Sequence, residues 1–222
     1  MHKEIISKGK DQETKDAQED TAVEKRISIL ESFIQKALAN YERNNKKLPE
    51  KIVVYRDGVG GPSMQQKVLS KELGKMSDAI KAHKPGYNPK ILYVFVNKEI
   101  NTRFFEMQKD GITVLNPPAG TVVDSNLVEL AEQAEQFDFY MIPHTASIAT
   151  ARPVHYIVAK NDCKFTKRAI EEFTYAMCYN YFNFGGSIKV PASVMYAHKV
   201  ANYCYDLGID PNDTLKNNLH YL

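Results

Sequence analysis

Tryptophan is absent from the sequence, cysteine occurs only three times, and no long apolar run is present. The cysteines, Cys163, Cys178 and Cys204, are too widely spaced for CxxC or zinc-ligand motifs. We therefore expect buried or free thiols in a reducing compartment, the cytoplasm or the nucleus. No stretch approaches the roughly 18 apolar residues of a membrane-spanning helix, and no apolar segment follows the N-terminal charges. The sequence therefore predicts no membrane partner and no secretory signal.

An excess of charge of either sign is also lacking. Lys and Arg number 29 against 27 Asp and Glu, a formal net charge of +2. A nucleic-acid surface would therefore have to be a local patch, because the global charge neither supports nor excludes RNA binding. With 222 residues, of which 43% are apolar, the chain is long enough for one domain with its own core.

The spacing of apolar residues predicts a tail followed by one α/β domain. Residues 1–20 are charged and polar with almost nothing to bury, which predicts a mobile tail or an exposed loop. Over residues 21–222, helical and strand patterns alternate, which is typical of a sheet with parallel strand pairs. Helices are expected over 27–41, over 64–83, after Thr166 as N-cap, and from Pro191 to Gly208; strands are expected at 52–55, 91–96, 121–123, 139–142 and 155–158.

Two residues are candidates for metal chemistry. Asp57 lies where a β-branched run ends and a glycine-containing turn begins (YRDGVGG), the strand end at which α/β proteins gather functional groups. A carboxylate there suits a hard cation such as magnesium, or it shapes its own turn before Gly58. His198 lies inside the last predicted helix, where a histidine is either a ligand or a satisfied core residue. The residues by themselves leave these alternatives open.

Basic and aromatic residues follow several of the predicted strands. Lys98 and Arg103 occur in NKEINTRFFE just after one strand, and His144 and Arg152 bracket the loop HTASIATARP after another. The planar guanidinium of arginine suits phosphate, whereas the alternative is an ordinary solvated loop. The run YNYFNFGG supplies rings that either stack on bases or fill a core.

The order of these segments resembles the Piwi domain of Argonaute-family proteins, and the Piwi clade most closely. The resemblance covers roughly residues 24–222, and RDGVG and YAHKVA are its most specific pieces. It implies an RNase H-like α/β fold, with a mixed sheet flanked by helices. The matching segments are, in chain order, IVVYRDGVG, GYNP, NTRFF, PPAGTVVD, FDFYMIPH, ARPVHYIV, TYAMCYNYFN, IKVPASVMYAHKVA and a terminal HYL.

The resemblance implies a metal site. Cleaving members of the family hold two magnesium (or manganese) ions with carboxylates and an Asp or His, which suits in-line displacement at a phosphodiester. By this resemblance Asp57, in the RDGV motif, and His198, in the YAH motif, are metal ligands and catalytic residues. A further catalytic Glu normally precedes the RDGV motif by about one helix. Ungapped matching places Lys25 there, and Glu24 takes the role after a shift of one residue.

The resemblance also assigns residues to a guide strand. Most of them are basic residues that contact guide phosphates in the family, although Glu99 stands where a second basic residue is common. The terminal carboxylate lies beside the pocket for the guide 5′-phosphate in this family. The implied partners are a small guide RNA and a complementary target RNA. The implied guide-binding residues are Lys98, Arg103, His144, Arg152, Tyr181 and Leu222.

Departures from the family pattern lead to two functional hypotheses. The N-terminal strands, one of which carries the family's first metal-binding Asp, have no counterpart here, and neither have the upstream MID and PAZ domains. We therefore expect the C-terminal portion of a longer protein, with its upstream domains as partners. The first hypothesis is a guide-RNA-binding Piwi domain of an RNA-guided endoribonuclease, with this portion unable to cut alone. The second is a non-cleaving silencing scaffold that binds guide and target RNA.

Overall fold

The computed structural model describes residues 30–125, 136–146 and 148–208. Its contacts divide the chain into two compact units, Met1–Glu50 with Gly61–Pro89 and Lys51–Gly60 with Lys90–Leu222. The tail predicted at residues 1–20 lies outside the described residues. None of the described helices is both long and apolar enough to cross a membrane.

The described part of the first unit contains two helices. One occupies residues 30–45, and its predicted first residues lie outside the described range. The other, α2, spans Pro62–His83 and confirms the helix expected at 64–83. Near its end, His83 Nε2 lies 3.2 Å from the Glu42 carboxylate of the first helix. The helical spacing of apolar residues was therefore enough to predict the described helices of this unit.

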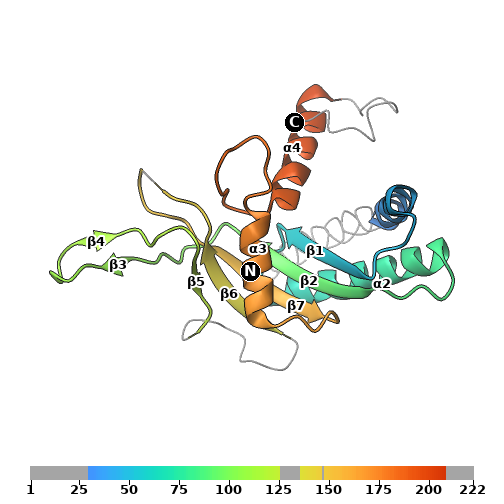
Figure 1. Ribbon diagram of the computed structural model, residues 1–222, viewed down its shortest axis with the longest axis horizontal. Coiled ribbons are helices and arrows are strands. Elements are labelled where there is room, and N and C mark those ends of the chain that lie inside the picture. Colours follow the sequence, from blue (N-terminus) through green and yellow to red (C-terminus); the bar gives the residue numbers. More distant parts are fainter. Residues whose placement is uncertain (1–29, 126–135, 147, 209–222) are drawn as a thin grey trace, which may run out of the picture. The chain divides into compact units, whose positions relative to one another are not determined.

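The second unit is built on a five-stranded mixed sheet in the order β1-β2-β7-β6-β5 (Figure 1). β1 and β2 are parallel, and the other neighbouring strands are antiparallel. The parallel pair is the one whose strands are joined through a helix, because a parallel connection needs a crossover. All five expected strands are confirmed, whereas the expected parallel pairing holds for one pair. The strands are β1 Lys51–Asp57, β2 Lys90–Asn97, β5 Thr121–Val123, β6 Phe137–Ile142 and β7 Val154–Asn161.

A separate two-stranded ribbon was not expected from the sequence. It pairs β3, Glu106–Met107, with β4, Val114–Leu115, and extends away from the main sheet (Figure 1). At its tip the Asp110 carboxylate accepts hydrogen bonds from the backbone amides of Ile112 and Thr113. Strands of two residues are too short to show alternation, so the sequence offered no periodic signal for them.

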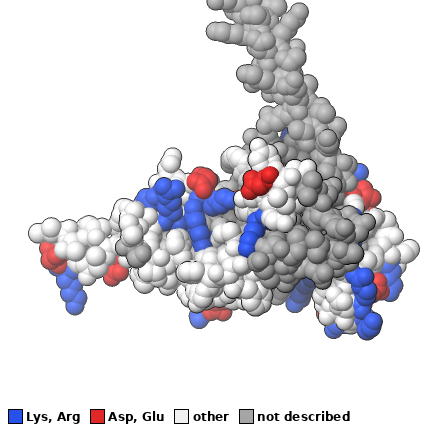
Figure 2. Space-filling view, turned by 90° about the horizontal axis from the view of Figure 1, so that it is seen from above, with Lys and Arg blue, Asp and Glu red and all other residues white. Residues whose placement is uncertain are grey.

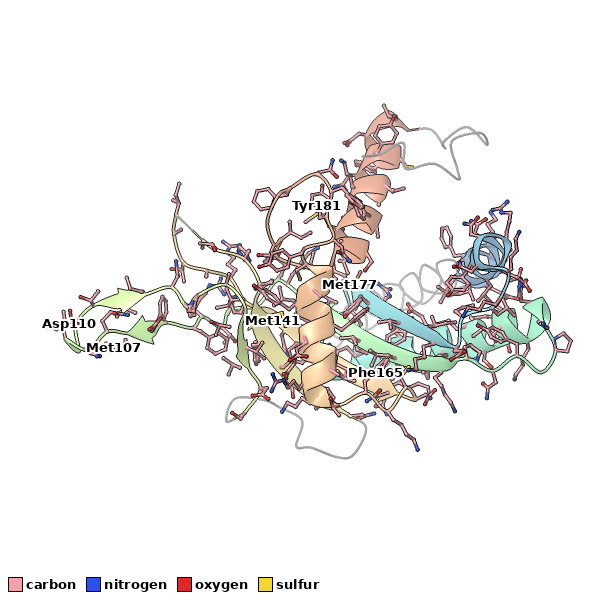
Figure 3. The ribbon with its side chains drawn as sticks, in the orientation of Figure 1. Met107, Asp110, Met141, Phe165, Met177 and Tyr181 are labelled. Atoms are coloured by element: carbon pink, nitrogen blue, oxygen red, sulfur yellow. The ribbon has the colours of Figure 1, made fainter. Side chains whose placement is uncertain are left out.

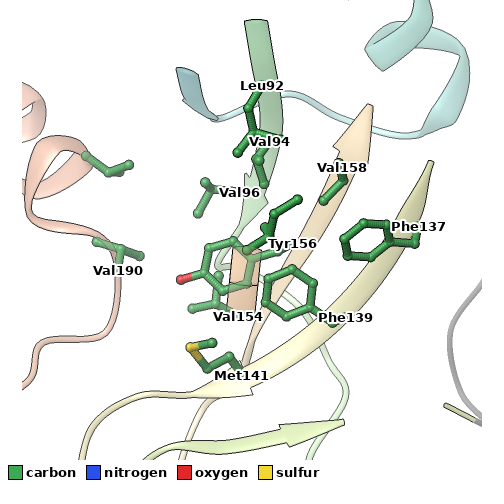
Figure 4. Close-up of a cluster of buried hydrophobic side chains, with 12 residues drawn as sticks. Leu92, Val94, Val96, Phe137, Phe139, Met141, Val154, Tyr156, Val158 and Val190 are labelled. Atoms are coloured by element: carbon green, nitrogen blue, oxygen red, sulfur yellow. The ribbon is translucent and has the colours of Figure 1, made fainter. Parts of the chain in front are cut away.

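One face of the sheet carries the hydrophobic core (Figure 4). Alternate residues of a strand point to the same face, and here the even-numbered apolar residues of β2 and β7 meet the odd-numbered ones of β6. Two helices of this unit cover them: α3, Lys167–Met177, contributes Ile170, and α4, Ala192–Leu207, contributes Val194. The cluster comprises Leu92, Val94, Val96, Phe137, Phe139, Met141, Val154, Tyr156, Val158, Ile170, Val190 and Val194.

The ends of α3 and α4 follow the expected capping pattern with one difference. The Thr166 hydroxyl accepts a hydrogen bond from the Ala169 amide, as the N-cap prediction requires. α4 ends at Gly208, whose φ of 62° lies in the left-handed region that glycine enters at little cost. Pro191 is the N-cap residue of α4 rather than a residue of its first turn.

Thr166→Ala is expected to lower the free energy of unfolding by about 1 kcal/mol, because the Ala169 amide loses its acceptor. Urea unfolding followed by circular dichroism measures this difference. Thr166→Ser keeps the hydroxyl and should retain most of the stability. Equal losses for the two variants would contradict a capping role.

Candidate functional site

Asp57 lies at the carboxyl end of β1 and on the face of the sheet that carries the core. Val53 and Tyr55 of the same strand pack against the core cluster, and the Tyr55 hydroxyl lies 2.8 Å from Thr174 Oγ1 of α3. Because side chains alternate along a strand, Asp57 projects to the same side as Tyr55. It lies beyond the last apolar residue of that row. The strand thus delivers a carboxylate to the edge of the core.

Lys98 reaches the same point from the neighbouring strand. In the parallel pair, Asp57 is the register partner of Val96, a core residue, and Lys98 follows two positions later. Residues two apart share a face, so Lys98 projects beside Asp57. Its Nζ lies 2.7 Å from Asp57 Oδ2. The parallel register of β1 and β2 is therefore what joins these two residues.

His198 completes the cluster from α4. It lies one helical turn after Val194, which is buried in the core, so the helix presents both on one face. His198 Nε2 lies 2.5 Å from Asp57 Oδ2 and 2.6 Å from Lys98 Nζ. Two sequence candidates that are 141 residues apart are thus brought into direct contact, together with Lys98.

The cluster is set into the surface rather than exposed on it. The side chain of Asp57 is 12% exposed, against 27% for Lys98 and 42% for His198. Burial by itself would raise the pKa of Asp57, but the contacts with Lys98 and His198 outweigh it and hold that pKa below its ordinary value. Asp57 is therefore an anion at neutral pH.

A carboxylate oxygen and an imidazole nitrogen that converge on one point fit two ligands of a divalent cation. Within the described residues, no group of three His, Cys, Asp or Glu side chains is placed to hold a metal ion. Glu24, the sequence candidate for a further ligand, lies outside the described residues. Asp57 and His198 therefore fit as a partial ligand set.

A second cluster, the basic cluster, consists of Lys98, Arg103, Arg152 and Lys189. Lys189 Nζ donates to the Lys98 carbonyl oxygen at 2.8 Å and lies 4.0 Å from Glu99. Burial lowers the pKa of Lys189; Glu99 opposes this, and the positive charges of Arg152, Lys98 and Arg103 lower that pKa further. In Figure 2, Lys and Arg side chains gather near the middle of the face shown, with acidic groups beside them.

His144 belongs to the margin of the basic cluster. Burial lowers the pKa of its imidazole, and the nearby charge of Lys189 lowers it further, so His144 is neutral at neutral pH. Among the residues that the structure describes, none forms a hydrogen bond with its buried Nδ1. Arg152 is exposed, whereas Arg103 is half-buried and donates to the carbonyl oxygens of Ile100 and Thr102 in its own loop.

Tyr181 lies apart from these contacts, against α4. Its ring centroid is 5.1 Å from that of Tyr196, and the Tyr196 hydroxyl accepts a hydrogen bond from the Phe182 amide. Figure 3 shows Tyr181 beside this helix. Leu222, the remaining candidate for guide binding, lies outside the described residues.

Two residues whose side chains hold neighbouring loops were not identified from the sequence. Lys189 is the only charged residue between Phe173 and Ala197, and its isolation in the sequence could have identified it as a candidate. Asn116 binds the loop between β6 and β7: its side chain donates to the Ala149 carbonyl and accepts from the Ala151 amide, both at 2.9 Å. No sequence pattern identified Asn116, because its partners are more than 30 residues away.

Comparisons with known proteins agree on one family. The Piwi domain family profile matches residues 4–206. Piwi-like protein 3 of Homo sapiens is 37% identical over 201 residues, covering 90% of this chain and 22% of that protein. The crystal structure of Drosophila Piwi matches with a TM-score of 0.73 at 31% identity, over 86% of this chain and 26% of that one.

A structure of Kluyveromyces polysporus Argonaute with a guide RNA matches with a TM-score of 0.72 at 25% identity, over 86% of this chain and 26% of that one. The predicted RNase H-like fold is confirmed by these neighbours. The chain spans 22% of the length of the first curated relatives.

Proposed function

Since the chain belongs to the Piwi domain family of Argonaute and Piwi proteins, we propose that it binds guide RNA as part of an RNA-guided endoribonuclease. In the complete protein, the proposed reaction is two-metal hydrolysis of a phosphodiester in a target RNA. The observation that carries this proposal is the convergence of Asp57 Oδ2 and His198 Nε2 at 2.5 Å, from two elements far apart in sequence.

The proposed ions are magnesium or manganese, with Asp57 and His198 as two of their ligands. When bound, such ions stabilise the charge that develops on the attacking and leaving oxygens. The carboxylate of Asp57 is anionic at neutral pH, which suits a ligand. His198 projects from α4, whose Val194 is anchored in the core, so the ring is held at the strand end. Fixed ligand positions are what an in-line displacement requires.

The basic cluster supports the nucleic-acid part of the proposal. Lys98, Arg103 and Arg152 act electrostatically on Lys189 beside Glu99, and positive charges grouped in this way attract an anion. A phosphate backbone supplies that anion. The Argonaute structure with a guide RNA among the neighbours supports a guide strand as the partner. The alternative is a non-cleaving scaffold that binds guide and target RNA through the same cluster.

Lys189→Met is expected to weaken binding of single-stranded RNA similarly for all sequences, because phosphate contacts are independent of the bases. The slope of log K against log salt should fall in magnitude by about 0.7, the value for one lost contact to a single strand. Fluorescence anisotropy between low and moderate salt measures it.

Lys160→Met is the matched control for this experiment. Lys160 pairs with Tyr93 near the start of β2, at the end of the sheet away from Lys98, and its partner is Asp162. This variant should keep the slope of the unaltered chain. An RNA affinity that does not change with salt would refute the phosphate contacts altogether.

A further inference from the structure

The contacts between Lys98, Asp57 and His198 cannot all be hydrogen bonds at once. The three distances, 2.7, 2.6 and 2.5 Å, join only the atoms Nζ, Oδ2 and Nε2. An imidazole nitrogen carries either a hydrogen or a lone pair, so Nε2 cannot both accept from Lys98 and donate to Asp57. A protonated Nε2 would place its hydrogen against an ammonium group at 2.6 Å.

The ammonium of Lys98 lies within hydrogen-bonding distance of both other atoms, whichever of the contacts holds a hydrogen. Nζ carries three N–H groups, so it can bond Oδ2 and Nε2 together. Lys98 Nζ thus stands beside both of the atoms that are proposed as metal ligands.

We infer that the Lys98 ammonium acts as an internal cation that a divalent ion must displace from Asp57 and His198 in order to bind there. The displaced ammonium then becomes available to a nucleic-acid phosphate. An ion such as Mg²⁺ lies about 2.1 Å from its ligand atoms. Nζ lies 2.7 and 2.6 Å from the same two atoms, so the ammonium and the ion exclude each other. The nucleic-acid half of this inference rests on the proposed function.

The backbone of Lys98 fixes where the released side chain can go. Its carbonyl oxygen is held by Lys189 Nζ, so its Cα stays within the basic cluster while the flexible stem moves. Release therefore adds one positive charge to Arg103, Arg152 and Lys189. Metal binding should favour phosphate binding, and the coupling must be reciprocal, since each ligand raises the affinity for the other by the same factor.

The first test measures metal binding without RNA. Mn²⁺ is titrated into the unaltered chain, Lys98→Met and Lys160→Met, and free Mn²⁺ is followed by electron paramagnetic resonance. Lys98→Met should bind roughly tenfold more tightly, the scale of one charge-assisted hydrogen bond that no longer competes. Lys160→Met should match the unaltered chain, and adding Asp57→Asn to Lys98→Met should remove the gain.

Equal or weaker Mn²⁺ binding by Lys98→Met, or no binding by any of the proteins, would overturn the inference. Lys98→Gln, which keeps a donor toward Asp57, should give a gain of the same sign if the methionine variant does not fold. A gain that survives Asp57→Asn would place the metal elsewhere and would equally overturn it.

The second test measures the coupling. The affinity for a short oligouridylate is determined with and without Mn²⁺ at constant ionic strength. The gain from Mn²⁺ should be several-fold in the unaltered chain and should vanish in Lys98→Met. The same gain in both proteins would overturn the coupling. Absence of RNA binding under every condition would refute the proposed function, while the Mn²⁺ titration would still decide the competition.

Discussion

Asp57→Ala in a guide-loaded protein that contains this chain is expected to abolish cleavage of a matched target RNA while guide binding persists. The variant removes an anionic oxygen that is held 2.5 Å from His198 Nε2. Loss of a metal ligand forfeits several kcal/mol of transition-state stabilisation, so the rate should fall by roughly 10³-fold or more. Single-turnover cleavage of a labelled target in magnesium measures this rate.

His198→Ala should show the same loss, because its Nε2 converges on the same point from α4. Asp162→Ala is the matched control: it also removes a carboxylate, but one that is paired with Lys160 after β7. Its rate should equal that of the unaltered protein. Cleavage that survives Asp57→Ala would contradict the metal-ligand role. If the unaltered protein holds its guide and does not cut, the scaffold alternative is correct.

Most strands could be predicted, and the family resemblance could be recognised, because both depend on local sequence. The continuous apolar run at 91–96 indicates a buried strand, and RDGVG places Asp57 at a strand end. The meeting of Asp57 and His198 could be expected only through the resemblance to a known family, since they lie 141 residues apart. Their catalytic role stays a prediction until cleavage is measured.

The position of Lys98 could not be predicted from its sequence neighbours. The strand that it follows, β2, is buried on both faces, so the apolar pattern does not say which face Lys98 joins. Only the register of β2 against β1 decides that it meets Asp57. As a result, the sequence assigned Lys98 to phosphate alone, whereas the structure shows its ammonium at Asp57 and its carbonyl at Lys189.

Asp138→Ala is expected to lower the free energy of unfolding by about 3 kcal/mol, the largest stability effect that we predict for a single replacement. Asp138 is fully buried, and its Oδ2 lies 2.6 Å from Nε2 of His155, which is 5% exposed. Removing one partner of a buried polar pair leaves the other without compensation for lost hydration. Urea denaturation measures the loss, and Asp162→Ala, at a half-buried surface pair, should cost less than about 1 kcal/mol.

A double variant, Asp138→Leu with His155→Phe, distinguishes the loss of the polar interaction from the loss of packed volume. If Asp138→Ala is destabilising because His155 loses the carboxylate beside it, replacing both groups by apolar ones should recover most of the stability. The His155 ring stacks on Tyr140 at 4.2 Å, and Tyr140 contacts Phe104, the neighbour of Arg103. A double variant that stays stable yet loses RNA affinity would show that the pair positions the Arg103 loop. A double variant as unstable as Asp138→Ala would instead assign the loss to packing.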